Sequence, residues 1–507
     1  MVAYPYVLLL TVVVPLVGAA VCYLTAPRLG RGVGWIAFAA ILYTTLQGII
    51  LEGQQLFGGT AQAVESYPWA PTAGLTFGFL ADGLSFPVLI VINLVLAATT
   101  VFSMPYMQKR IQGLDGGEKP GRYGMYYLNY LLISAGLAGI VLSTNLIEIY
   151  LFLEMVLIPT FVIISLFGYA QKERVAIIYI IWNQLGAFIF LSGIALFYTA
   201  TTPHTFDLSP TSLAQAAASP LAFWIAGLVL VGWLVKMAVF GVHMWLPITE
   251  AEPPTAFAPT MAVVSGVGNY VIVRLLLFGM PSVFQAFSLP LMAWAVLTMF
   301  YAGAVALAQT DVKYLFAWST MSQNAYSILG IASFSLIGAT GGVFYFLSHI
   351  MGKFVMFSVA GILLVQTGRR DLREMGGLAG KMPFTATLFL LGALILSAVP
   401  PTSGFQAEWT MFAGIFSQGA AGSSVYLAVA VLGLVATLFT VAYTLWPMRR
   451  MFFGPLPQSL AEVKEAPLTM TLPLLAIAIV SIVIGIYPDL VLKPLYSFAS
   501  GLHLGLR

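Results

Sequence analysis

The chain is dominated by apolar segments of about 20 residues that recur from one end to the other. A helix of that length rises about 30 Å, which matches the hydrocarbon core of a lipid bilayer. Of the 507 residues, 60% are hydrophobic and only 8% are charged, and the mean hydropathy is +0.96. This composition excludes an ordinary soluble domain. The sequence therefore predicts an all-α polytopic membrane protein.

About fourteen segments have the length and apolar character of a membrane-spanning helix. They lie near residues 5–26, 33–52, 83–104, 125–143, 146–168, 175–199, 221–245, 255–280, 286–308, 313–335, 339–366, 383–416, 424–447 and 468–488. The first lacks a basic leader and is too long for a signal-peptide core, so we expect it to be retained.

The distribution of basic residues tests this number of spans, because Lys and Arg concentrate in cytoplasmic loops. The even-numbered loops between the predicted spans contain none, whereas the odd-numbered loops contain sixteen of the 21. Those sixteen are Arg28, Arg31, Lys109, Arg110, Lys119, Arg122, Lys172, Arg174, Lys313, Arg369, Arg370, Arg373, Lys381, Arg449, Arg450 and Lys464. One missing or extra span would scramble this alternation. We therefore expect fourteen helices with both termini on the outer side of an energy-transducing membrane.

Two predicted spans are interrupted. The seventh runs into Gly241 and a polar, proline-containing stretch, and the twelfth contains Pro400 and Pro401, which a regular helix cannot accommodate. Broken helices at corresponding positions are typical of transporters built from inverted repeats. The pattern predicts two inverted five-helix repeats, spans 4–8 and 9–13. The expected divisions are residues 1–122, 123–281, 282–453 and 454–507; the alternative is that the prolines are ordinary kinks.

Ionisable residues within the spans are the main functional signal. A charged side chain at the centre of a membrane helix costs roughly 2.5 to 3.5 kcal/mol, so such residues usually pair and line a polar path. The predicted proton carriers are Glu154, Lys236, His243, His349, Lys353 and Glu408. The glutamates and lysines among them can exchange protons when a pair is separated. The histidines have a plainer alternative as packed, hydrogen-bonded side chains.

A second set could either join that pathway or anchor helix ends. It comprises Glu148, Asn269, Tyr270, Arg274, Asp311, Lys313 and Gln323. The single cysteine, Cys22, excludes a disulfide framework, a cysteine-ligated Fe–S cluster and a multi-cysteine zinc site within the chain. We expect no cofactor and no catalytic residue here. The net charge of +3 is small, and the basic residues are distributed according to the predicted side of the membrane. The charge therefore does not suggest binding to nucleic acid.

Several motifs together resemble the antiporter-like membrane subunits of respiratory complex I. They are Leu153 to Pro159, Lys236 with His243 to Pro247 and Glu252 to Thr255, Gln309 to Leu315, His349 with Lys353, Arg370 to Leu372 with Gly376 to Leu378, and Ser403 to Phe405 with Glu408. Related subunits occur in sodium/proton antiporters and membrane-bound hydrogenases. Tyr67 to Pro71, followed by Asp82 to Ser85, is most similar to chain M of complex I.

The resemblance implies fourteen helices, two inverted repeats with broken helices 7 and 12, and proton translocation along a central polar axis. It implies that Glu154 and Lys236 form an input switch and that Glu408 lies near the exit. It also implies other membrane subunits as neighbours, including antiporter-like ones, surrounding lipids, and flavin and Fe–S clusters in partner subunits that transfer electrons to a quinone.

The sequence departs from that family at the centre of the relay. Gly266 stands where a lysine is usual, and Gln323 where a histidine is frequent. Ala238 and Gly241 replace the usual prolines, and Ile248 to Glu250 replace Asp-Ala-His. Neutral side chains such as Asn269, Tyr270, Gln323, Asn324 and Tyr326 could order water there.

The sequence is compatible with three functions. The first is a proton-translocating, chain-M-like subunit of a complex I-type oxidoreductase, with the redox chemistry in partner chains. The second is a subunit of a cation/proton antiporter or membrane-bound hydrogenase. The third is a structural paralogue that does not conduct, an alternative that Gly266 and Gln323 favour.

Overall fold

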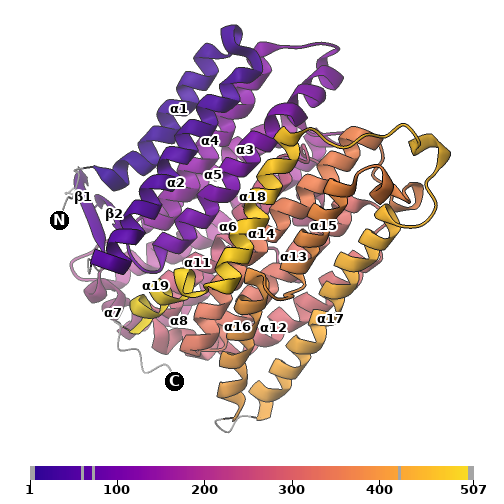
Figure 1. Ribbon diagram of the computed structural model, residues 1–507. Coiled ribbons are helices and arrows are strands. Elements are labelled where there is room, and N and C mark those ends of the chain that lie inside the picture. Colours follow the sequence, from indigo (N-terminus) through magenta and orange to yellow (C-terminus); the bar gives the residue numbers. More distant parts are fainter. Residues whose placement is uncertain (1–5, 59–61, 71–74, 421–423, 501–507) are drawn as a thin grey trace.

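The chain folds into a bundle of long helices that run side by side (Figure 1). The computed structural model describes residues 6–58, 62–70, 75–420 and 424–500. The long unbroken helices are α1 (Val7–Leu29), α2 (Val33–Gly58), α3 (Ser85–Asp115), α4 (Pro120–Leu142), α5 (Leu146–Phe167), α6 (Lys172–Ala200), α12 (Pro281–Leu307), α13 (Val312–Ala332), α14 (Leu336–Thr367), α17 (Ser424–Phe452) and α18 (Leu468–Ile486).

Ten helical segments of the described chain are long and apolar enough to cross a membrane, or eleven if the bent pair of α7 (Pro210–Ala218) and α8 (Ala222–Lys236) is one span. The polytopic membrane character is therefore confirmed. The ten include α1 and α2 as one segment, Val7–Gln54, and do not include α13. Each of the fourteen expected ranges contains helix, and the number fourteen stays a prediction.

The middle of the bundle is formed by α3, α14 and α10 (Ala258–Gly266), most of whose side chains are buried. By contrast, α1, α6 and α17 each leave a large part of their surface exposed. Polar residues on α13 and α14 are therefore enclosed by other helices.

The seventh and twelfth spans are broken where the sequence predicts. In the seventh, α8 ends at Lys236 and α9 (Leu246–Ala251) follows; in the twelfth, α15 (Pro383–Leu396) is followed by α16 (Ser403–Ala420). Both breaks contain an alanine with positive φ, 58° at Ala238 and 52° at Ala398.

The backbone hydrogen bonds at the two breaks also correspond, residue for residue. Met237 N donates to Trp233 O, Ala238 N to Val235 O, Val239 N to Leu234 O and Val242 N to Val239 O; Ser397 N donates to Ala393 O, Ala398 N to Ile395 O, Val399 N to Leu394 O and Thr402 N to Val399 O. The two breaks are thus the same local structure used twice. The arrangement of the remaining helices into two repeats stays a prediction.

The fold is mostly helical, as the all-α prediction expects, and it contains in addition one hairpin that the sequence analysis did not predict. Strands β1 (Ala63–Ala70) and β2 (Leu75–Ala81) form an antiparallel hairpin. The Glu65 carboxylate accepts from the backbone N–H groups of Leu8 and Leu9, at 3.0 and 2.9 Å, and so caps the start of α1. A search for long apolar segments cannot detect such short strands.

The eighth expected span is also less regular than predicted. It comprises α10, α11 (Gly268–Ile272) and a π-helical turn over Val273–Leu277. A short helix, α19 (Asp489–Ser500), follows α18. Single π-turns within helices often accompany functional sites.

Loops predicted to share a membrane side contact one another at one end of the bundle. Arg110 donates to the Phe167 carbonyl, Tyr169 N donates to Glu252 O, and Lys313 Nζ donates to the Pro253 carbonyl. These contacts join the third, fifth, seventh and ninth loops. Their convergence agrees with the parity deduced from the loop charges.

Candidate functional site

Glu154 on α5 and Lys236 at the end of α8 are linked through two adjacent amides of α6. Gln184 Nε2 donates to Glu154 Oε1 at 3.2 Å, and Lys236 Nζ donates to Asn183 Oδ1 at 3.3 Å. Lys236 is buried, with 3% of its surface exposed. Glu154 is the acidic residue whose charge acts on Lys236. The structure therefore brings the two predicted residues together as an amide-bridged pair.

Asn183 and Gln184 were not among the predicted site residues. Their signal is present in the sequence, since two consecutive amides interrupt the apolar run of the sixth span. Asn183 is buried and also donates through Nδ2 to the Tyr179 carbonyl at 3.0 Å. Its side chain is therefore oriented by its own helix and can present its oxygen to Lys236.

His243 lies in the seventh break, surrounded by aromatic rings. Its ring centroid is 5.7 Å from that of Phe240, 5.1 Å from Tyr301 and 5.6 Å from Trp318. Its Nδ1 accepts from Gly241 N at 3.1 Å. A nitrogen that accepts is unprotonated, so this contact favours neutral His243 with its proton on Nε2. Among the described residues, no hydrogen bond joins it to another predicted carrier.

Lys353 on α14 is completely buried and is held by α13. Its Nζ donates to the Phe316 carbonyl at 2.7 Å and to the Ser319 hydroxyl. His349 lies one turn away, is 1% exposed, and has neither ring nitrogen in a hydrogen bond to the described chain. The Lys353 charge acts on His349. The predicted pair is thus enclosed in the bundle.

Glu250 on α9 is a buried carboxylate that the sequence prediction did not include. It has 0% exposure, and the charges of Lys353 and Lys313 act on it. The sequence signal was an acidic residue in the polar stretch after a broken helix. Its significance depended on packing, because Lys353 is 103 residues further along the chain.

Gln323 is the centre of a hydrogen-bonded network beside Glu408. Its Oε1 accepts from Tyr345 at 2.9 Å, and its Nε2 donates to Tyr443 at 2.7 Å and to Thr440 at 3.2 Å. The Glu408 charge acts on Tyr345 and Tyr443. Glu408 itself is partly exposed. The side chain that replaces the usual histidine therefore joins several hydroxyl groups near the predicted exit.

Gly266 leaves no room for a side chain. A Cβ atom added there would lie 2.4 Å from Phe346 Cε2 and 3.3 Å from Asn324 Oδ1. Asn269 Nδ2 donates to the Gly266 carbonyl at 3.0 Å, and the side-chain oxygens of Asn269 and Asn324 make no hydrogen bond to the described chain. The usual lysine is replaced by a phenyl ring with neutral amides beside it.

Arg274 and Tyr270 form a fixed structural cluster. Arg274 makes two 2.7 Å contacts with the carboxylate of Asp82, and its Nε donates to the Tyr270 hydroxyl at 3.1 Å. Tyr270 donates to the Val141 carbonyl at 2.5 Å. Asp82 also accepts from the backbone of Leu84 at the start of α3. This geometry favours the anchoring alternative for both residues.

Asp311 and Lys313 occupy the end of the bundle where the odd-numbered loops meet. Asp311 caps α13 by accepting from Lys313 N at 2.8 Å, and it forms a 2.9 Å ion pair with Arg370. The Lys313 amine is fully buried, lies 2.6 Å from the Pro253 carbonyl, and is 4.7 Å from the Tyr169 ring centroid. Asp311 is thus an anchor, whereas Lys313 points its charge into the protein.

Glu148 lies at the opposite end of α5 from that cluster. It is fully buried, and its Oε1 accepts from Gly78 N of β2 at 2.6 Å, while Oε2 has no partner in the described chain. The hairpin therefore covers Glu148. No described ion pair includes it.

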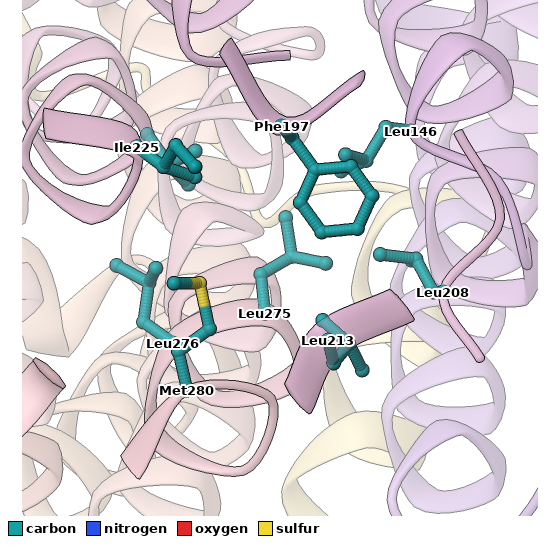
Figure 2. A pocket seen from close by; sticks show the side chains of 9 residues that line it. Leu146, Phe197, Leu208, Leu213, Ile225, Leu275, Leu276 and Met280 are labelled. Atoms are coloured by element: carbon teal, nitrogen blue, oxygen red, sulfur yellow. The ribbon is translucent and has the colours of Figure 1, made fainter. Parts of the chain in front are cut away.

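A small cavity lies between α5, α6, α7, α8 and the π-helical turn Val273–Leu277, and it is lined only by apolar side chains (Figure 2). The labelled residues are Leu146, Phe197, Leu208, Leu213, Ile225, Leu275, Leu276 and Met280. None of these side chains is ionisable. The cavity is therefore not lined by any of the predicted proton carriers.

The sequence and fold were compared with known proteins. Residues 143–440 match the family described as "NADH:quinone oxidoreductase/Mrp antiporter, TM". The chain is 28% identical over 499 residues to the F(420)H(2) dehydrogenase subunit M of Methanosarcina mazei, which covers 95% of each chain. It is 30% identical over 464 residues to an NAD(P)H-quinone oxidoreductase chain 4 of Thermosynechococcus vestitus, covering 89% of this chain and 83% of the relative.

Two solved structures share the fold. A chain of the Mrp complex from Dietzia sp. superposes with a TM-score of 0.85 at 22% identity, covering 99% of this chain and 98% of that one. A chain of respiratory complex I from Thermus thermophilus gives 0.84 at 23% identity, covering 98% and 100%. With more than half of its length matched, the chain belongs to the NADH:quinone oxidoreductase/Mrp antiporter family of membrane subunits.

Proposed function

We propose that this chain translocates protons as an antiporter-like, chain-M-type subunit of a complex I-type oxidoreductase. The observation that carries the proposal is the series of ionisable residues from α5 to α16, of which Lys236, His349 and Lys353 are fully enclosed. It begins with the amide-bridged pair of Glu154 and Lys236, includes the Lys353 and His349 pair, and ends at Glu408 with its hydroxyl network.

The energy required is compatible with such pairs. Moving one charge against 100 mV takes about 2.3 kcal/mol. A tenfold change in proton affinity corresponds to about 1.4 kcal/mol, so a change of roughly a hundredfold is enough. Separating Lys236 from Glu154 removes a favourable charge interaction in a medium of low dielectric constant. That separation can release the lysine proton toward the centre of the bundle.

Electron transfer would take place in partner subunits that hold flavin and Fe–S clusters and reduce a quinone. The neighbours would be other membrane subunits, including further antiporter-like chains, with lipids around them. The names of the curated relatives, subunit M and chain 4 of redox complexes, support this assignment. The exposed apolar faces of α1, α6 and α17 suit contacts with lipid or with such neighbours.

A cation/proton antiporter subunit is the second candidate. The Mrp chain and the complex I chain have nearly equal TM-scores, so the fold favours neither. The composition of the purified complex distinguishes the two candidates: co-purifying flavin and Fe–S subunits support the first, and an assembly of membrane subunits without them supports the second.

The proposal is tested by pumping measurements on the purified complex in sealed vesicles. Glu154→Gln and Lys236→Ala should each lower proton uptake per electron transferred while the complex stays assembled. Glu173→Gln and Lys119→Ala, at exposed positions, are the matched controls. Unchanged pumping in both test variants would contradict proton translocation by this chain, and would favour the non-conducting paralogue.

A further inference from the structure

We propose that Glu250 is the central proton-holding residue of the path and exchanges its proton with Lys353. This inference rests on the proposed function and adds to it an ionisable residue in a part of the path where the lysine usual at position 266 is missing. It makes the centre of this chain a carboxylate–amine pair.

Glu250 lies on α9, the short helix after the break in the seventh span, and its side chain is fully buried. Neither carboxylate oxygen makes a hydrogen bond of good geometry with the described chain. An ionised carboxylate in such a place is unstable unless an opposite charge compensates it. Glu250 must therefore either bind a proton or have a cationic partner.

The surroundings of Glu250 include two other helices. Helix α9 packs against α13, the helix that binds the Lys353 amine of α14. Both Lys353 Nζ and Thr320 Oγ1 donate to one acceptor on α13, the Phe316 carbonyl, at 2.7 and 3.0 Å. The Lys353 amine is therefore held on the helix against which the Glu250 segment packs, and the positive charges of Lys353 and Lys313 favour the ionised form of Glu250.

Lys313 and Lys353 lie at different depths in the bundle. A proton that passes from Glu250 to Lys353 therefore moves away from the loop end, where Lys313 lies. Lys313 lies at the loop end of the bundle and is held by the Pro253 carbonyl, three residues from Glu250. Lys353 lies in the middle of α14, one turn from His349. Glu250 therefore lies three residues from the contact of one lysine at the loop end, and on a helix that packs against the element binding the other.

Position 266 is a glycine in this chain, where related subunits usually have a lysine. Phe346 and Asn324 occupy the space that a side chain at Gly266 would need. A lysine at position 266 would therefore clash with the present packing, whereas Glu250 supplies a buried ionisable group on the neighbouring helix α9. The other broken span also has a glutamate after its break, Glu408 on α16.

The O–H bond of protonated Glu250 breaks and an N–H bond forms on the neutral Lys353 amine, which leaves a carboxylate and an ammonium. Lys353 becomes neutral again by releasing a proton toward His349. The Lys313 charge stabilises the ionised form of Glu250. Glu250 then binds a new proton that enters from the loop side.

The test uses the intact complex in sealed vesicles, with Glu250→Gln compared with Glu250→Asp. We expect Glu250→Gln to lower proton translocation attributable to this subunit by at least about tenfold, as for loss of a positioned acid or base. Glu250→Asp should retain most of it. Glu173→Gln is the control for an exposed carboxylate.

A structural role is distinguished by infrared difference spectroscopy. Driving turnover should change the carbonyl stretching band of a protonated carboxyl group, and that band should be absent in Glu250→Gln but retained in the exposed control Glu173→Gln. If Lys236→Ala abolishes pumping while Glu250→Gln leaves both pumping and the band unchanged, this inference is overturned and the proposed function stands. If neither variant affects pumping, the proposed function fails as well.

Discussion

Ala238 and Ala398 have the same left-handed backbone conformation at the same point of two broken helices, with φ of 58° and 52°. They are 160 residues apart, and the hydrogen bonds around them correspond one to one. A left-handed conformation is unfavourable for a residue with a Cβ atom. Finding it twice, at alanine, indicates that the surrounding packing imposes the break.

The strain at these alanines can be measured. Ala398→Gly should change the free energy of unfolding little, because relief of about 1 kcal/mol of backbone strain offsets the greater freedom of glycine in the unfolded chain. Ala304→Gly, in the regular helix α12, should lower it by about 1 kcal/mol. Thermal unfolding of the purified complex compares the two. Equal destabilisation would show that the left-handed alanine is not strained.

Gly266 should not accept any larger residue. Gly266→Ala places a Cβ 2.4 Å from Phe346, so we expect a loss of about 1 to 3 kcal/mol and a lower yield of assembled subunit. Phe346→Leu in the same chain should restore part of the loss. Gly53→Ala, on α2 with nothing within 4 Å of the new atom, should be tolerated. Full tolerance of Gly266→Lys would disprove the steric account.

The Asp82–Arg274 pair should contribute to stability and not to pumping. Asp82→Asn removes one partner of a largely buried pair with two 2.7 Å contacts, which costs about 3 to 5 kcal/mol. The exposed pair of Arg369 and Glu374 is the control, and Glu374→Gln should change stability by less than about 1 kcal/mol. Thermal unfolding measures both. Protons pumped per electron in the Asp82→Asn complex that assembles should equal the wild-type value.

Asn183 should be required for coupling Glu154 to Lys236. Asn183→Leu removes the oxygen that accepts from Lys236, and we expect proton uptake to fall by about tenfold, the size of effect given by one charge-assisted hydrogen bond. Asn129→Leu is a close control, because Asn129 also donates to the carbonyl four residues earlier but contacts no lysine. Equal pumping in the two variants would show that the amide bridge has no functional role.

The sequence predicted much of the site because buried charge is rare in membrane helices. Lys236, Lys353 and His349 are all enclosed as expected, and both breaks occur where prolines or glycine interrupt an apolar run. Their assigned roles remain predictions. Glu250 was missed because a glutamate near a proline-containing stretch is, by sequence alone, as consistent with an exposed loop as with the interior.

The sequence by itself determined that the chain is a polytopic membrane protein with two broken helices, and to which family it belongs. Membrane thickness fixes the length of apolar helices, and glycine in one span and two prolines in the other mark where the apolar runs are interrupted. Only the tertiary structure decided which charges meet. Lys353 binds to α13, against which the Glu250 helix packs, Arg274 binds Asp82, and Gln323 joins Tyr345 and Tyr443. Each of these pairings depends on the packing of helices far apart in the chain, which helical periodicity does not encode.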